Sequence, residues 1–182
     1  MNWQLIFDIG AQSTERFLPF VYIGLGLIAV AGGLRLWARR RKQGSFMAVM
    51  LAIAAVLVGG LGYGLNAWDH HRLVARLKSG DVLQAQGAAT AHQKWRQDIG
   101  TSSNSSARRY NHWETITVGG VAFTWAPGEQ QAAFSNAQTP PLALQDGLML
   151  RISYVEDVAG QAHERRILRL EVQGGGGLKV QP

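Results

Sequence analysis

Two apolar runs decide the fold: residues 17–34 read FLPFVYIGLGLIAVAGGL, and residues 46–65 read FMAVMLAIAAVLVGGLGYGL. Neither run contains Asp, Glu, Lys or Arg. A helix of about 20 apolar residues crosses a hydrocarbon core about 30 Å thick, because each residue adds about 1.5 Å. The sequence therefore predicts a transmembrane helical hairpin over residues 17–66.

The segment between the runs is strongly basic. Its five Lys and Arg residues are Arg35, Arg39, Arg40, Arg41 and Lys42. The two flanks of the hairpin hold four: Arg16, Arg72, Arg76 and Lys78. Cytoplasmic loops retain Lys and Arg, so this distribution favours a loop in the cytoplasm and both termini outside. We therefore expect a two-pass protein of a bacterial inner membrane with a periplasmic C-terminal domain.

Small residues recur at four-residue spacing in the second run. The pairs are Ala48 with Ala52, Ala55 with Gly59, and Gly60 with Gly64. Helices in lipid associate through small residues that let their backbones approach. We expect this surface to pack against the first helix. The alternative is that part of it forms a homo-oligomer.

The formal net charge of +6 belongs mainly to the hairpin. Residues 1–66 carry six Lys and Arg against two Asp and Glu, whereas residues 67–182 carry twelve against ten. A near-neutral outer domain argues against nucleic acid as a partner. The chain contains no cysteine, which removes disulfides, thiol catalysis and thiolate metal sites.

Residues 81–173 carry the pattern of a small β-domain. Two β-favouring runs, Trp113–Val118 and Val121–Trp125, flank Gly119-Gly120, which predicts a tight hairpin. Apolar residues alternate with polar ones over residues 148–154 and 168–172, which predicts a second hairpin. Five or six short strands joined by hairpins favour a small antiparallel barrel or sandwich, with an OB-like barrel among the options.

The other boundaries follow from composition. Residues 1–16 are predicted to be an N-terminal tail, and residues 67–80 a helical stalk that continues the second helix and ends at Gly80. Residues 174–182 form a Gly-rich tail, expected to be flexible. A fragment that begins near Ser79 is then expected to fold without the hairpin.

Aromatic and arginine side chains are the main candidates for a ligand or partner surface. They are Trp95, Arg108, Arg109, Tyr110, Trp113, Trp125 and Arg151. Core packing is the alternative role for the aromatic members.

Asp69, His70 and His71 are adjacent in a predicted helix, where successive side chains point about 100° apart, so we expect no metal site and no cofactor. His92, His112 and His163 are scattered, and we expect no catalytic centre.

Three segments carry a resemblance: Glu114–Phe123, Asp146-Gly147 leading into Arg151–Tyr154, and Ile167–Val172. Their pattern resembles that of small, uncharacterised bacterial two-pass membrane proteins with a C-terminal β-domain. The resemblance implies a fold and no active site, because its motifs are turn glycines and alternating strands. The plan of two helices and a small β-barrel is also similar to the nucleotide-gated membrane effectors of bacterial antiphage defence, which hold the barrel in the cytoplasm.

Two functions follow as hypotheses. The first is a non-catalytic, membrane-anchored interaction or assembly module whose β-domain, outside the cytoplasm, meets a protein partner or a second copy of the chain. The alternative is a ligand-gated sensor or effector whose β-domain binds a small anionic ligand and whose helices oligomerise. A cavity lined by tryptophan and arginine would favour the alternative, and a filled core the first hypothesis.

Overall fold

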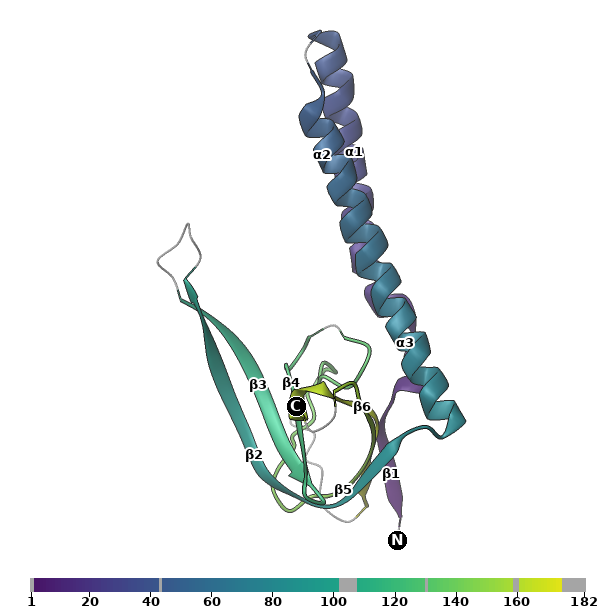
Figure 1. Cartoon of the computed structure of the whole chain (residues 1–182), viewed down its shortest axis with the longest axis vertical. Helices are drawn as coiled ribbons and strands as arrows, with labels where there is room; N and C mark the ends of the chain where they lie inside the picture. Colours follow the sequence, from purple (N-terminus) through teal and green to yellow (C-terminus); the bar gives the residue numbers. More distant parts are fainter. Residues whose placement is uncertain (1, 43, 102–107, 130, 159–160, 175–182) are drawn as a thin grey trace. The chain divides into compact units, whose positions relative to one another are not determined.

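The computed structural model of the chain describes residues 2–42, 44–101, 108–129, 131–158 and 161–174 (Figure 1). The chain divides into two compact units. We call residues 13–72 the helical unit, and residues 1–12 with 73–182 the β unit. The predicted Gly-rich tail lies outside the described residues from Gly175 onward.

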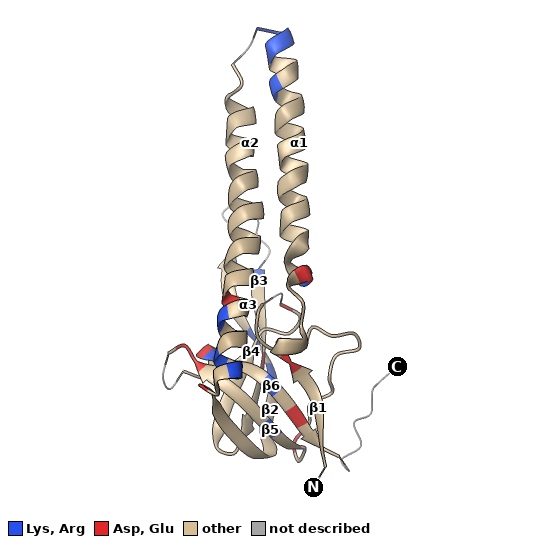
Figure 2. Cartoon of the chain, turned by 90° about the vertical axis from the view of Figure 1, so that its right-hand side faces the viewer, with Lys and Arg blue, Asp and Glu red and all other residues tan. Residues whose placement is uncertain are grey.

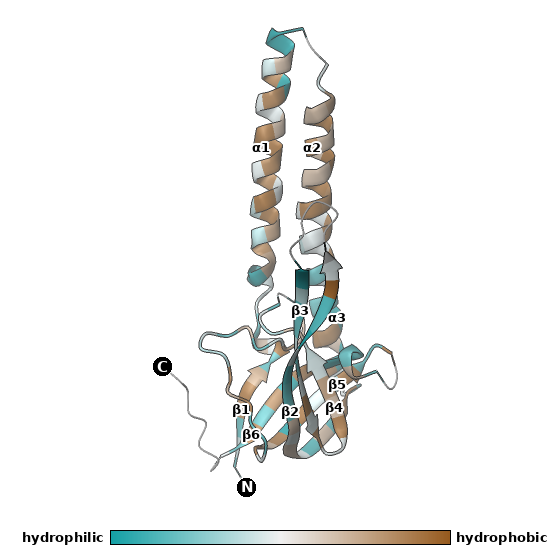
Figure 3. Cartoon of the chain, turned by 90° about the vertical axis from the view of Figure 1, so that its left-hand side faces the viewer, coloured by the Kyte–Doolittle hydropathy of each residue, from teal (hydrophilic) through white to brown (hydrophobic). Residues whose placement is uncertain are grey.

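Two long helices build the helical unit. The 3-10 turn η2 (Thr14–Phe17) leads into α1 (Leu18–Arg40), and Ser13 Oγ caps η2 by accepting a hydrogen bond of 3.1 Å from the Glu15 amide. The second helix joins α2 (Phe46–Val56), the π-helical turn η3 (Leu57–Leu61) and α3 (Gly62–Ser79). Both helices are long and apolar enough to cross a membrane, and apolar residues run along α1 and α2 in Figure 3. The predicted pair of apolar helices is thus confirmed.

Basic residues gather where α1 ends, as Figure 2 shows. The guanidinium carbon of Arg41 lies 4.4 Å from the centre of the Trp37 ring, one turn earlier. Lys42 takes a positive φ of 51°, and the chain leaves the helix there. Arg39–Lys42, the predicted determinants of topology, therefore form one compact basic cap on this helix.

Six antiparallel strands form one open sheet in the β unit. They are β1 (Trp3–Asp8), β2 (Leu83–Thr101), β3 (Arg108–Val118), β4 (Val121–Trp125), β5 (Met149–Glu156) and β6 (Arg165–Gln173). The strand order is β1-β6-β5-β2-β3-β4, so β1 and β4 are the edges. Short 3-10 turns follow β1 (η1, Ile9–Ala11) and precede β6 (η4, Ala162–Glu164). The antiparallel β-domain is confirmed, whereas a closed barrel, a sandwich or an OB-like fold is not.

Both predicted hairpins are present. Val118 pairs with Val121 across Gly119-Gly120, whose φ angles are +57° and +80°. Glycine takes such angles at no steric cost, which is why this pair can close a two-residue turn. Gly119 has a second reason to be glycine, because a Cβ there would lie 2.8 Å from the Gln86 carbonyl oxygen of β2. The β5–β6 hairpin is closed by residues 157–164, and Ile152 pairs with Leu170.

The core of the β unit is filled by apolar side chains from both halves of the sheet. Residues Leu83–Ala88 of β2 pair with β5, whereas β2 from Ala89 onward pairs with β3, so β2 belongs to both halves. The largest fully buried members of this core are Ile116, Val118, Phe123, Leu150, Ile152 and Leu170. Burial of this apolar surface is the main source of stability for the unit.

The predicted N-terminal tail contains a strand. Trp3–Asp8 pairs with β6, with Trp3 opposite Gln173 and Asp8 opposite Arg169. A six-residue edge strand just before a much stronger apolar run gives little signal of its own, which is why the sequence does not reveal it. The helical hairpin is therefore an insertion between the first and second strands of one sheet.

The end of α3 also belongs to the β unit. Leu73 is 0% exposed and packs in a second apolar cluster with Ile9, Val155 and Leu168. Gly80 ends the helix as predicted, with a φ of +77°. A fragment that begins at Ser79 would lack both β1 and the Leu73 contact. The compact β unit includes residues 2–12 and 73–80 as well, so we now expect the longer chain, and not the Ser79 fragment, to fold without the hairpin.

Candidate functional site

A two-stranded arm extends the sheet. The pairing of β2 with β5 ends at Ala88, and the pairing of β3 with β4 starts at Glu114. Beyond these points β2 and β3 pair only with each other among the described residues, and their ribbons run past the neighbouring strands in Figure 1. We call residues 93–101 and 108–113 the β2–β3 arm. Nine residues at about 3.3 Å each give it a reach of about 30 Å.

A bulge fixes the base of the arm. The register of β2 shifts between Thr90 and Gln93, where Ala91 takes a positive φ of 54°. The His92 amide donates a hydrogen bond of 2.8 Å to Asp146 Oδ1, and Ala89 exchanges backbone hydrogen bonds with Gly147 and Leu148. Bulges bend a strand and increase its twist. The turn at Asp146 therefore holds β2 where it leaves the sheet.

A buried carboxylate sits at the same base. Glu114 is 1% exposed, and its Oε1 lies 2.7 Å from His92 Nε2 and 3.8 Å from Lys94 Nζ. Its Oε2 is buried with no hydrogen-bond partner among the described residues. A buried charge is tolerated only when it is paired, so the His92 contact ties β2 to β3 at this point.

An aromatic stack covers the opposite side of the arm's base. The rings of Trp95 and Trp113, which are cross-strand partners, lie 6.0 Å apart at an angle of 25°. Trp95 Nε1 donates a hydrogen bond of 3.0 Å to Thr115 Oγ1, which lies 3.0 Å from Thr124 Oγ1. Trp95 remains 43% exposed. A rigid, partly exposed indole of this kind suits a binding surface.

The outer part of the arm is exposed on both faces and mostly basic. The Arg96 guanidinium carbon lies 4.8 Å from the centre of the Tyr110 ring, and Arg108 Nη1 donates to Asp98 Oδ2 at 3.2 Å. Ile99 is 48% exposed and Tyr110 37%. Lys and Arg outnumber Asp and Glu in the described arm by four to one: Lys94, Arg96, Arg108 and Arg109 against Asp98.

Five of the seven predicted surface residues lie on this arm: Trp95, Arg108, Arg109, Tyr110 and Trp113. Trp125 instead lies in the core, 4% exposed, with its ring 5.4 Å from that of Phe134. Arg151 lies on β5, where it contacts Gln86, Glu171 and the Trp3 ring. Neither contributes to the arm. Lys94, Arg96 and Ile99 belong to it and were missed, because residues 88–98 fit a helix or a strand equally well.

A pocket of about 220 Å³ lies beside Trp113 and Trp125, with Arg165 and Arg166 in its wall. Arg165 donates to Glu156 Oε1 at 2.6 Å and to the Ala122 carbonyl oxygen at 2.8 Å. Arg166 Nη1 lies 3.4 Å from Asp157 Oδ2. Both guanidinium groups are therefore already engaged by protein acceptors, which reduces the attraction of this pocket for an anion.

Metal chemistry has no geometric support in the described parts of the chain, which contain no group of three or more His, Asp or Glu residues able to hold an ion. The rings of His70 and His71 lie 5.8 Å apart at 71°. His70 is 5% exposed, and its Nδ1 is 3.2 Å from Arg16 Nη2. These residues tie α3 to the start of α1 within the helical unit.

The helices meet along small residues. Gly24, Ala31 and Ala38 are buried on α1, and Ala48 and Ala55 on α2, each at seven-residue spacing. A Cβ on Gly24 would lie 3.0 Å from the Ala55 carbonyl oxygen and from the Gly59 Cα. Of the predicted packing residues, Ala48, Ala55 and Gly59 therefore lie in the contact, and Ala52 lines a groove beside it. Gly60 and Gly64 are outside it, since a Cβ on either would meet no atom within 4 Å.

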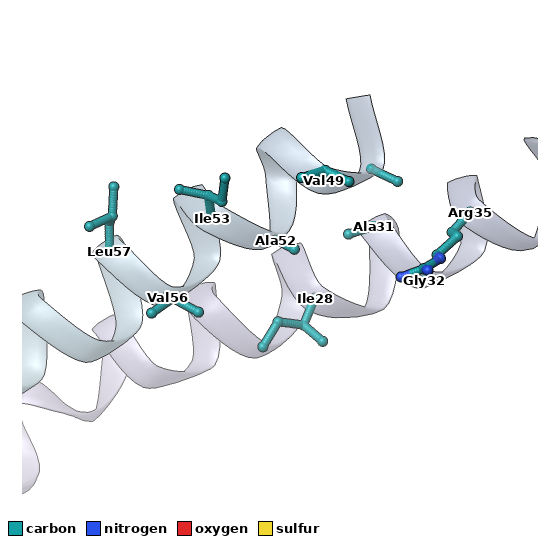
Figure 4. Close-up of a pocket in the computed structure, with 10 residues that line it drawn as sticks. Ile28, Ala31, Gly32, Arg35, Val49, Ala52, Ile53, Val56 and Leu57 are labelled. Carbon is teal, nitrogen blue, oxygen red and sulfur yellow. The ribbon is translucent and has the colours of Figure 1, made fainter. Parts of the chain in front are cut away.

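The groove beside this contact has a volume of about 570 Å³ and lies between α1 and α2. Its lining is apolar apart from Arg35, and includes Ile28, Gly32, Ala52 and Val56. Figure 4 shows Arg35 at one end and Leu57 at the other.

No match emerges when the chain is compared with protein-family models, with curated proteins and with solved structures. The resemblance drawn from strand and turn motifs therefore stays a prediction.

Proposed function

We propose that the chain is a two-pass membrane protein whose β unit is an interaction module outside the cytoplasm, with no catalytic step. The apolar helices and the basic cap at Arg39–Lys42 support this orientation. The pairing of β1 with β6 supports two crossings. Strands of one sheet must lie on one side of a bilayer, so a hairpin that returns to its starting side suits this topology and a single crossing does not.

The β2–β3 arm carries the proposal for binding. An isolated two-stranded ribbon is marginally stable in water, and this one leaves Trp95, Ile99 and Tyr110 partly exposed. Aromatic and arginine side chains dominate the hot spots of protein interfaces. The β2 bulge at Ala91, beside the His92 amide that donates to Asp146, and the His92–Glu114 contact hold the base of the arm. Such preorganisation lowers the entropy lost on binding. We infer that the arm docks on a protein partner.

Site-specific photo-crosslinking in the full chain, in native membranes, tests this function. A photoreactive residue at Ile99 should give a discrete protein adduct. The same residue at Val158, which is 45% exposed in the β5–β6 connection, is the matched control. The substitution Trp95→Ala should reduce the Ile99 adduct without removing the protein from the membrane. Equal adducts from both positions, or none from Ile99, would contradict the docking role.

The alternative, a ligand-gated sensor, has two supporting observations. One is the 220 Å³ pocket beside Trp113 and Trp125, and the other is the open surface at Gly60 and Gly64, which could join helices of two copies. Mass spectrometry of small molecules released when the purified chain is denatured tests it. One recurrent anionic compound would favour the sensor over the docking module.

A further inference from the structure

Arg35 places a positive charge at the groove between α1 and α2. It is the one charged residue in a lining that is otherwise aliphatic. Its side chain lies along α1 toward Gly32 (Figure 4), and it makes no hydrogen bond or ion pair within the described chain. Arg35 is exposed, and an unpaired positive charge at the end of an apolar groove attracts an anion. The groove therefore suits a ligand that has an anionic group at the Arg35 end and an apolar chain along the rest.

The direction of the groove fits one leaflet of a bilayer. Arg35 and Ala48 lie at its end near the connecting loop, while Ile28 and Leu57 lie at its deep end. The helix rises about 14 Å from Ala48 to Leu57 at about 1.5 Å per residue. That is close to half of a hydrocarbon core about 30 Å thick. Arg35 would then meet the head-group region, where long basic side chains reach from an apolar helix.

We propose that this groove holds one anionic glycerophospholipid, with its phosphate at Arg35 and an acyl chain along Gly32, Ala52 and Val56. The inference rests on the membrane placement proposed above. A guanidinium group donates paired hydrogen bonds to phosphate oxygens, and the phosphate supplies the charge that the groove lacks. The apolar lining excludes water and packs against the acyl chain of the lipid by van der Waals contact.

A second copy of the chain fits the groove less well. Residues 17–65 contain no Asp or Glu, so another hairpin in the same orientation has no carboxylate to offer at this depth. A symmetric dimer about this groove would instead bring two Arg35 side chains to one interface. Like charges in a medium of low dielectric repel strongly. The charge pattern thus favours lipid.

Native mass spectrometry of the full chain in mild detergent, titrated with phosphatidylglycerol or phosphatidylcholine, tests the site. Two matched pairs of variants separate the groove from general effects. Gly32→Leu fills the groove, whereas Gly33→Leu adds the same side chain outside it, and neither glycine has a neighbour within 4 Å of its Cβ position. Arg35→Gln and Arg40→Gln remove the same charge from α1, inside and outside the groove.

We expect the wild type, Gly33→Leu and Arg40→Gln to retain one phosphatidylglycerol about tenfold more tightly than phosphatidylcholine. Arg35→Gln should abolish this preference, and Gly32→Leu should reduce uptake of both lipids about tenfold. Such changes correspond to about 1.4 kcal/mol.

Equal effects of Arg35→Gln and Arg40→Gln, unchanged uptake by Gly32→Leu, or dimers that Gly32→Leu alone dissociates would each overturn the site. Release of the wild type from membranes by alkaline carbonate would overturn the membrane placement as well. Retention in the membrane with groove-independent uptake would overturn the lipid site alone.

Discussion

Arg169 on β6 donates two hydrogen bonds to one oxygen of Asp8 on β1, from Nε at 3.1 Å and from Nη2 at 2.7 Å. The two residues are 161 positions apart and are also register partners in the sheet. The other oxygen of Asp8 accepts the Gly10 amide at 2.7 Å and starts the turn that leaves the sheet. This ion pair joins the segment before the helices to the last strand, so it links the two ends of the β unit in sequence.

The substitution Asp8→Ala should lower the stability of the β unit by about 1 to 2 kcal/mol. A charged hydrogen bond is worth about 1.5 to 3 kcal/mol, and the partly exposed Arg169 side chain reduces this by solvent screening. Thermal unfolding of the full chain in detergent measures the change. Glu15→Ala is the control, because Glu15 is exposed and its side chain makes no hydrogen bond or ion pair within the described chain. A double substitution with Arg169→Ala that costs the sum of the single changes would show no coupling between them.

The β unit should fold without the hairpin only when both of its N-terminal parts are kept. Residues 2–12 joined to residues 73–182 by a long Gly-Ser linker retain β1 and the buried Leu73. We expect this chain to give a β-rich circular dichroism spectrum and one cooperative melt. A fragment that begins at Ser79 leaves β6 as an unpaired edge and opens the cluster around Ile9, Val155 and Leu168. Equal melting temperatures for the two chains would show that neither β1 nor Leu73 matters.

The sequence reveals features with a strong local signal. The two apolar helices, the Gly119-Gly120 turn and the β5–β6 hairpin follow from length, glycine and alternation. It does not reveal β1, because a short edge strand is stabilised by its partner and not by its own pattern. The sequence does not reveal the arm for a related reason. Both faces of the arm are exposed, so its apolar and polar residues do not alternate.

The candidate site is predicted in composition and only partly in position. The arginine and aromatic set identifies five arm residues, but Trp125 differs from Trp113 in being on the core side of its strand. Which side a residue faces depends on register, and one residue of register exchanges the faces. The groove depends on the rotation of each helix about its axis. In α1 that rotation places Gly24, Ala31 and Ala38 against the second helix. The sequence of one apolar run does not indicate which of its faces meets the other helix.

The two turn glycines should respond differently to substitution. Gly120 has a φ of +80° with open space around its Cβ position, so Gly120→Asn should be nearly neutral, because asparagine tolerates this conformation. Gly119→Asn places a Cβ 2.8 Å from the Gln86 carbonyl oxygen and must displace the β2 backbone. We expect a loss of about 1 to 3 kcal/mol for Gly119→Asn, the range for local backbone strain. The melting temperatures of both variants decide this, and equal losses would contradict the close approach to Gln86.

Alkaline pH should weaken the β unit through Tyr154. Burial raises the pKa of this phenol above its usual value of 10.0, with a further contribution from Glu156 and a partial offset from Arg165. A folded-state pKa above the unfolded value means that the folded chain holds the phenolic proton more tightly. The resulting stability is fully present below pH 10 and is lost as the pH rises through the folded pKa.

The variant Tyr154→Phe keeps the ring that packs edge-on, 5.0 Å from Phe123, and removes the proton. It should therefore lose less stability than the wild type between pH 9 and the alkaline limit of folding. Chemical unfolding at a series of pH values measures this difference, and Tyr110→Phe, on the arm, is the matched control. The difference in phenolate absorbance between the wild type and Tyr154→Phe should appear mainly as the protein unfolds. Identical alkaline profiles for the wild type and Tyr154→Phe would mean that Tyr154 ionises in the folded chain as freely as in the unfolded one.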